Sequence, residues 1–91
     1  MLNLQHLSTF LTVAALKNFS QAATRLGYSQ SNVTTQIKNL EKELGAELFE
    51  RERFSRSVAL TGAGKRMLRN ARRLLALERK AHSSVRGQAG G

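Results

Sequence analysis

Residues 18–45, NFSQAATRLGYSQSNVTTQIKNLEKELG, predict a short helix, a tight turn and a second helix. Apolar residues recur at helical spacing through the second helix and indicate one buried face. These residues are Val33, Ile37, Leu40 and Leu44. Ser29 can cap the start of this helix by accepting a hydrogen bond from an unpaired backbone N–H, and Gly45 suits the left-handed position after its last turn. Two helices joined in this way are typical of a DNA-binding helix-turn-helix.

The opposite face of the second helix carries side chains that can form hydrogen bonds with base edges. Glutamine can pair with adenine through two hydrogen bonds, serine and threonine can serve several bases, and the threonine methyl can pack on thymine. We predict that base-contacting residues lie near the start of this helix, at Gln30, Ser31, Thr34 and Thr35. Ser29 and Lys38 are predicted to contact the DNA backbone, since a helix N-terminus and basic side chains favour phosphate. For each residue taken singly, a solvated polar face is the alternative.

Two further helices are predicted to complete a three-helix core. Asn18 can cap the short helix, and Gln21 can complete a capping box there. The inner face of that helix is predicted at Ala22, Ala23 and Leu26. The helix before it has apolar residues at helical spacing, which are Leu4, Leu7, Leu11 and Ala14 with Phe10 and Val13 beside them. Phe10, Phe19 and Phe49 are expected in the core, because aromatic residues make up 5% of the chain and lie among aliphatic ones.

The segment after Gly45 predicts a two-stranded β wing. Residues 47–51 and 58–60 alternate as short strands do, and the polar, basic loop 52–57 joins them. We expect the loop and its edge to bring arginines to phosphates or into a minor groove, namely Arg51, Arg53 and Arg56. The alternative is a solvated loop, but three arginines close together beside the second helix favour DNA.

A long helix is predicted from about Ala63 to about Ser84, with Thr61 as its cap and a length of roughly 30 Å. One face of this helix is apolar and the other is rich in arginine. Because the apolar stripe is too long for so small a body to cover, we predict that the same helix of a second chain covers it. The predicted dimer interface consists of Met67, Leu68, Ala71, Leu74 and Leu75.

Composition limits the function further. The 91 residues allow one small domain with an appendage, and the net charge of +9 predicts attraction to a polyanion. The chain has no cysteine, which fits a reducing, cytoplasmic location, and no apolar run of membrane-spanning length. His6 and His82 lack metal-ligand spacing, and residues 62–65 lack the full pattern of a phosphate-binding loop. We therefore predict no enzyme activity, cofactor, metal site or membrane partner.

Several motifs together resemble the N-terminal DNA-binding domain of LysR-type transcriptional regulators. The matching segments are Leu7–Phe10, FSQAATRL at 19–26, SQ at 29–30, IKNLEKELG at 37–45, LFER at 48–51 and LTGAG at 60–64. The resemblance implies a mostly α fold: a winged helix-turn-helix over residues 1–61, then a linker helix over 62–86 that dimerises. It further implies a C-terminal effector domain beyond this chain. The glycine-rich residues 87–91 themselves predict a flexible tail.

The resemblance also assigns roles to residues. It implies that the second motif helix contacts bases through Gln30, Ser31, Thr34 and Thr35, and that Arg51 contacts DNA from the wing. Ser31 stands where the family often has proline, and Thr35 where it often has a basic residue, so the base preference is left open. The implied partners are double-stranded DNA, at an inverted-repeat operator, and a second copy of the chain. A tetramer is left open for the full-length protein.

Two other functions compete with sequence-specific DNA binding. One is a basic architectural protein that binds nucleic acid without sequence preference, and the other is a basic helical module that docks on acidic membranes or proteins. Both need positive charge, but neither needs the polar cluster between Gln30 and Lys38. The cluster therefore favours sequence-specific binding.

Overall fold

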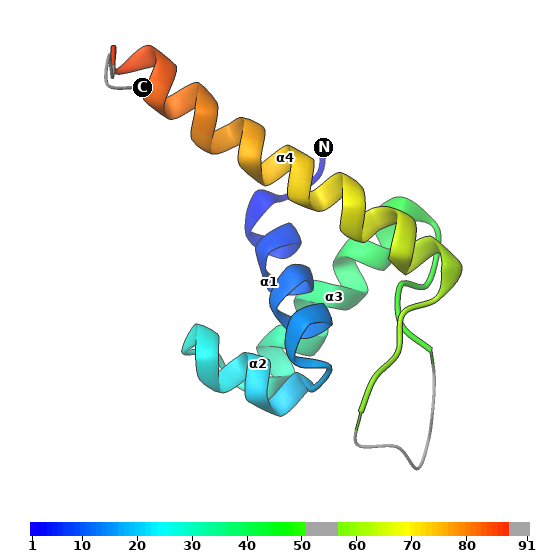
Figure 1. Ribbon diagram of the computed structural model, residues 1–91. Coiled ribbons are helices and arrows are strands. Elements are labelled where there is room, and N and C mark those ends of the chain that lie inside the picture. Colours follow the sequence, from blue (N-terminus) through cyan, green and yellow to red (C-terminus); the bar gives the residue numbers. More distant parts are fainter. Residues whose placement is uncertain (51–56, 88–91) are drawn as a thin grey trace.

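The computed structural model describes residues 1–50 and 57–87 of the chain. In these residues the chain forms four helices, three of them packed into a body and the fourth running across it (Figure 1). They are α1 (Leu4–Leu16), α2 (Phe19–Leu26), α3 (Gln30–Leu44) and α4 (Gly62–Val85). The predicted mostly helical fold, with a helix-turn-helix and a long following helix, is confirmed.

Each helix begins at a capping side chain that accepts a hydrogen bond from the backbone N–H three residues later. The pairs are Asn3 with His6, Asn18 with Gln21, Ser29 with Asn32 and Thr61 with Gly64. The caps predicted at Asn18, Ser29 and Thr61 are confirmed. α2 and α3 end at Gly27 and Gly45, whose φ angles of 74° and 69° are easy for glycine. α1 instead ends at Lys17, which has a φ of 55°.

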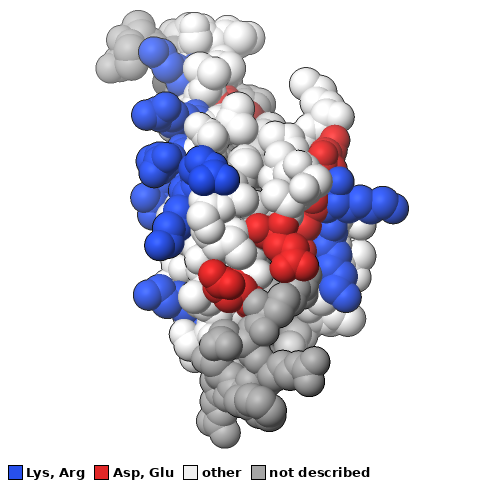
Figure 2. Space-filling model, turned by 90° about the vertical axis from the view of Figure 1, so that its right-hand side faces the viewer, with Lys and Arg blue, Asp and Glu red and all other residues white. Residues whose placement is uncertain are grey.

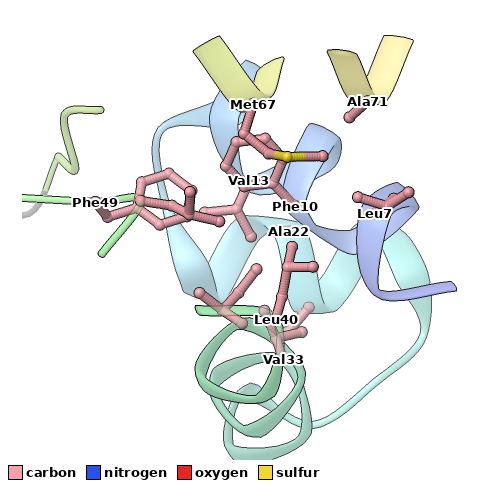
Figure 3. Packing of buried hydrophobic residues seen from close by; sticks show 12 residues of the cluster. Leu7, Phe10, Val13, Ala22, Val33, Leu40, Phe49, Met67 and Ala71 are labelled. Carbon is pink, nitrogen blue, oxygen red and sulfur yellow. The ribbon is translucent and has the colours of Figure 1, made fainter. Parts of the chain in front are cut away.

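The core forms where α1 packs against the other three helices. Its fully buried apolar side chains on α1 are Leu7, Phe10 and Val13, which lie among buried residues of the other helices (Figure 3). The predicted α1 stripe was therefore wrong at one end, because Leu4 is 40% exposed. Three helices cover α1, so its buried face is centred on Phe10, and Leu4 in the first turn lies at the edge of that face. Leu44, in the last turn of α3, is likewise 37% exposed.

Three phenylalanine rings join the helices to the segment after α3. The ring of Phe49 lies 5.5 Å from that of Phe10 and 5.7 Å from that of Phe19, measured between centroids. Both pairs are inclined rather than stacked face to face, which is the arrangement that aromatic quadrupoles favour. The prediction that these phenylalanines belong to the core is confirmed, since Phe10 and Phe49 are buried and Phe19 packs against them.

The two arms of the wing are held together by an antiparallel bridge between Phe49 and Leu60. The backbone N–H of Glu50 donates to the Ala59 carbonyl at 2.7 Å, and that of Thr61 donates to the Leu48 carbonyl at 3.0 Å. In the described residues the predicted strands thus appear as one bridge. The predicted loop, with Arg51, Arg53 and Arg56, lies almost entirely outside the described residues.

The start of α4 is fastened to the first arm of the wing. The Thr61 hydroxyl donates to the Glu47 carbonyl at 2.6 Å while it caps the helix at Gly64. Gly64 is needed for this approach, because a Cβ atom there would lie 2.1 Å from the Leu48 carbonyl oxygen. Such a contact is far inside van der Waals distance, so a side chain at position 64 would force α4 away from the wing.

The first half of α4 belongs to the core. Met67 and Ala71 are buried in the chain itself, and Figure 3 shows Met67 pointing from α4 toward Val13 and Phe10. The prediction that a second chain must cover the whole apolar stripe was therefore wrong for Met67 and Ala71. α1 lies beneath that half of the helix and covers them.

The second half of α4 projects beyond the body (Figure 1). The molecule measures 50 × 26 × 19 Å and its radius of gyration is 14.4 Å, whereas a compact domain of this length has roughly 12 Å. The predicted helix over 62–86 corresponds to Gly62–Val85. Of the predicted tail only Gly87 is described, and residues 88–91 lie outside the described residues. None of the described helices is both long and apolar enough to cross a membrane.

Candidate nucleic-acid interface

The N-terminal end of α3 lies beside α2, on the side of the molecule away from α4 (Figure 1). The turn between the two helices is fixed by Tyr28, whose backbone N–H donates to the Ala23 carbonyl at 2.9 Å. Gln30, Ser31 and Thr35 are exposed there, as the sequence predicts, and Lys38 is exposed one turn further on. Thr34 is half-buried. The helix-turn-helix therefore presents most of the predicted base-contacting residues to solvent together.

The amide of Gln30 is held by a side chain from the neighbouring helix. The Ser20 hydroxyl on α2 donates to Gln30 Oε1 at 2.7 Å. The carbonyl end of this amide is thus engaged by the protein, and its amino group faces away from that contact. Because a long glutamine side chain loses rotamer freedom on binding, such fixing in advance reduces the entropic cost of a base contact.

Ser29 and Ser31 form a second polar group at the start of α3. Ser29 Oγ accepts a hydrogen bond from the Asn32 backbone N–H at 3.1 Å and lies 3.1 Å from Ser31 Oγ. The Ser29 side chain therefore belongs mainly to the helix cap. This arrangement leaves the hydroxyl of Ser31, on the exposed face, as the better placed of the two for a ligand.

A second exposed amide at the start of α3, that of Asn32, was not predicted from the sequence. Asn32 Oδ1 accepts from Gln36 Nε2 at 3.0 Å, and Gln36 Oε1 accepts from the Thr9 hydroxyl at 2.6 Å. Thr9 and Gln36 are buried although both are polar. The sequence does hold a signal, since Asn32 and Gln36 are four residues apart and so share a helix face. Gln36 faces inward because α1 packs against α3 and brings Thr9 to it, which the sequence around Gln36 does not show.

Positive charge is concentrated on α4 as well as near α3. Figure 2 shows a column of Lys and Arg side chains along the α4 edge of the molecule, apart from the acidic side chains nearer its centre. The exposed basic residues of the helix are Lys65, Arg66, Arg69, Arg72, Arg73, Arg79 and Lys80. They lie on the face turned away from α1. A field of this sign attracts polyanions over a longer range than any single contact.

The exposed apolar residues of α4 form a seam that differs from the predicted one. Leu74 is 38% exposed and Leu77 62%, and Ala81 and Val85 continue the same face of the helix. Leu68 and Leu75 are half-buried against the core cluster. Leu77 was missed, although its position three residues after Leu74 and four before Ala81 is the spacing of a coiled-coil seam.

The arrangement of histidine and acidic side chains bears on whether the described part of the chain could bind a metal ion. No three side chains among histidine and the acidic residues come together there in a way that could hold a metal ion. His82 contacts Glu78 through Nε2 and Oε2 at 2.6 Å, which is a pair within one helix.

A protein-family model matches residues 4–65 of the chain, and its description is "Bacterial regulatory helix-turn-helix protein, lysR family". The match covers both motif helices, the wing and the start of α4.

Individual relatives agree with this match. The chain is 42% identical to the HTH-type transcriptional regulator TfdT of Cupriavidus pinatubonensis over 93 residues, which is 98% of this chain and 40% of TfdT. It is 41% identical to the HTH-type transcriptional regulator BudR of Klebsiella aerogenes, over 99% of this chain and 62% of BudR. The chain thus spans about two-fifths to three-fifths of the length of these two relatives.

Among solved structures, the fold is similar to that of CbnR_DBD in its complex with DNA. The TM-score is 0.89 and the sequences are 38% identical, over 97% of this chain and 99% of that one. The structure of Vibrio fischeri DarR in complex with DNA also matches with a TM-score of 0.89, at 32% identity.

Proposed function

Because the chain belongs to the lysR family of bacterial regulatory helix-turn-helix proteins, we propose that it binds double-stranded DNA sequence-specifically as part of a transcriptional regulator. The observation that carries this proposal is the exposed polar end of α3, which presents Gln30, Ser31 and Thr35 to solvent. A nonspecific binder would need the positive charge alone. Solved relatives are described as DNA complexes, which supports the same partner for this chain.

In the proposed complex, the start of α3 enters the major groove. Gln30, Ser31, Thr34 and Thr35 contact base edges, and Ser29 and Lys38 contact phosphates on either side. The wing adds Arg51, Arg53 and Arg56, which lie outside the described residues. Residues 1–61 form the DNA-binding unit and residues 62–86 the linker in this proposal. A cytoplasmic location follows from it, because bacterial DNA lies in that compartment.

We also propose that two copies bind together. A single recognition helix contacts only a few base pairs, which is too little to select one site among the many in a genome. The seam Leu74, Leu77, Ala81 and Val85 projects beyond the body and is exposed in a single chain. Pairing two such helices would cover these side chains, with Leu68 and Leu75 at the edge of the contact. Met67 and Ala71 then support the interface from inside the core.

A binding selection from randomised double-stranded DNA tests the proposal. The purified chain is incubated with a random duplex library, and the bound DNA is amplified and sequenced over several rounds. We expect enrichment of an inverted repeat whose half-sites lie one or more helical turns apart. Recovery of DNA without any enriched sequence would instead indicate a nonspecific architectural protein.

A further inference from the structure

We propose that Asn32 is a further base-contacting residue, and that the buried residues Thr9 and Gln36 position its amide so that the amino group faces the DNA. The side chain then acts as a hydrogen-bond donor and selects a base edge that offers only acceptors, such as the N7 and O6 edge of guanine. This inference rests on the proposed function, because it concerns the base preference of the same helix.

The contacts form a relay from α1 to the exposed surface of α3. The Thr9 hydroxyl donates to Gln36 Oε1 at 2.6 Å, and Gln36 Nε2 donates to Asn32 Oδ1 at 3.0 Å. Thr9 is fully buried, Gln36 is 8% exposed, and Asn32 is exposed in the first turn of α3. Through this relay, the buried Thr9, which cannot contact DNA, orients the exposed Asn32, which can.

The orientation of both amides in the relay depends on which acceptor receives the hydrogen bond from the Thr9 hydroxyl. Thr12 and Thr24 donate their hydroxyl protons to the carbonyl four residues earlier in their own helices. Thr9 instead donates across to Gln36, so the oxygen of that buried amide faces α1 and its amino group faces Asn32. Asn32 must then turn its oxygen inward. In this direction both the oxygen and the amino group of the buried Gln36 amide have a partner, which matters because an unpaired polar group is costly in a low-dielectric environment.

Gln30 is arranged in the same way by a different contact. Its Oε1 accepts from the Ser20 hydroxyl at 2.7 Å. In the described part of the chain, neither the Gln30 amino group nor that of Asn32 donates to a protein atom. At the start of α3, the side-chain amino groups of Gln30 and Asn32 are therefore both available to donate hydrogen bonds to a ligand.

A side chain that can only donate hydrogen bonds prefers a base whose major-groove edge carries acceptors. Guanine offers two acceptors in the major groove, whereas adenine places an amino group beside its one acceptor. The pairing of glutamine with adenine through two hydrogen bonds requires the glutamine oxygen, and Ser20 already engages that oxygen in Gln30. We therefore expect guanine at the position that faces Asn32.

The test compares duplexes that differ from the selected site at one base pair at a time. Affinities are measured for the parent chain and for Asn32→Ala, Thr9→Val and Thr9→Ser. The position at which Asn32→Ala loses discrimination identifies the contacted base. We expect guanine there in the parent, and a roughly 3- to 10-fold loss of affinity when 7-deazaguanine removes its N7 acceptor, the range for one uncharged hydrogen bond.

Thr9 supplies the matched pair of variants. Thr9→Val keeps the shape but removes the hydroxyl, so it should reduce discrimination at the same single position, and Thr9→Ser should retain it. Thr9→Val in the Asn32→Ala background should have no further effect at that position. Discrimination is a ratio of affinities within one preparation, so partial unfolding of a variant does not change it.

Several outcomes would overturn the inference. Unchanged discrimination in Asn32→Ala would remove Asn32 from the contact. A preference for cytosine or adenine at its position, read through their amino groups, would show the amide reversed. An equal loss on every duplex for Thr9→Val would leave Thr9 a purely structural role. A parent chain without any sequence preference would instead refute the proposed function itself.

Discussion

Lys17 adopts a backbone conformation that usually favours glycine. Lys17 ends α1 in the left-handed region, with a φ of 55°, where glycine ends α2 and α3. Its carbonyl accepts a hydrogen bond from Val58, so the backbone there is fixed by the second arm of the wing. The left-handed conformation costs an ordinary residue about 1–2 kcal/mol. This site therefore holds strain that the sequence alone did not reveal.

Replacing Lys17 with glycine tests whether the backbone at this position is strained. Lys17→Gly should raise the free energy of unfolding by about 0.5–1 kcal/mol, because relief of the strain exceeds the added freedom of glycine in the unfolded chain. Ala15→Gly, at an exposed position in the last turn of α1, is the control and should lower it by about 0.5–1 kcal/mol. Urea unfolding followed by circular dichroism measures both. Two variants destabilised alike would contradict the account of Lys17.

Among the polar residues of α3, some positions could be predicted from the sequence and others could not. Ser31 and Thr35 could be assigned to the exposed face because apolar spacing places them opposite Val33 and Ile37. Gln30 lies in line with Ile37 and is exposed because it is the first residue of α3. Gln36 could not be assigned to the core, because nothing in its own sequence context shows that Thr9 will meet it. Asn32 was missed for the same reason, since its orientation depends on Gln36.

At the scale of elements, the close approach of α4 to the wing depends on Gly64. A Cβ atom at this position would meet the Leu48 carbonyl oxygen at 2.1 Å and Leu60 Cδ2 at 2.9 Å. The carbonyl belongs to the backbone and cannot move without breaking its hydrogen bond from Thr61. Because residue 64 has no side chain, α4 can pack closely against the wing, and this packing sets the angle at which α4 leaves the three-helix body.

The neighbouring glycine gives a matched comparison. Gly64→Ala should lower the free energy of unfolding by about 1–3 kcal/mol or more through overpacking. Gly62→Ala should raise it by up to about 1 kcal/mol, because its Cβ would meet only the Arg66 side chain, at 3.6 Å. Thermal unfolding of both variants measures the difference. A Gly64→Ala variant as stable as the parent would show that α4 can shift on the wing without loss.

Helices were predicted more accurately than their contacts. Caps at Ser29 and Thr61 and the glycine at the end of α3 set the helix limits, because these residues act on their own backbone. The buried face of α1 was misjudged at Leu4, since which face is buried depends on how many neighbours cover the helix. Of the two predicted strands of the wing, the described residues show one antiparallel bridge, between Phe49 and Leu60.

On the scale of the whole molecule, α4 divides into a half that stabilises the body and a half that projects from it. The apolar stripe of its sequence extends past Ala71, although Glu78 interrupts it, so the sequence alone could not show where α1 stops covering the helix. Met67 and Ala71 lie in the covered half, and Leu77 and Val85 lie in the projecting half. Only the projecting half therefore needs a partner.

Dimerisation can now be tested without disturbing the core. Leu74→Glu combined with Leu77→Glu should make the chain monomeric, because burying an unpaired charge in a helix seam is strongly unfavourable. Helical content should be retained, since both side chains are exposed in the single chain. Ala76→Glu with Ser83→Glu, exposed on the opposite face, is the control with the same added charge and should remain dimeric. Analytical ultracentrifugation distinguishes these results. A dimeric Leu74→Glu, Leu77→Glu variant would place the interface elsewhere.

In the proposed complex, α3 recognises a specific DNA sequence through the side chains at its N-terminal end. The most direct measurement is a titration of the parent and of Gln30→Ala on the selected duplex and on a scrambled duplex of equal length. Gln5→Ala, an exposed glutamine on α1, serves as the control. We predict that Gln30→Ala loses about 1–3 kcal/mol of binding free energy on the selected duplex and far less on the scrambled one. Equal losses on the two duplexes, or none on either, would contradict base recognition by this helix.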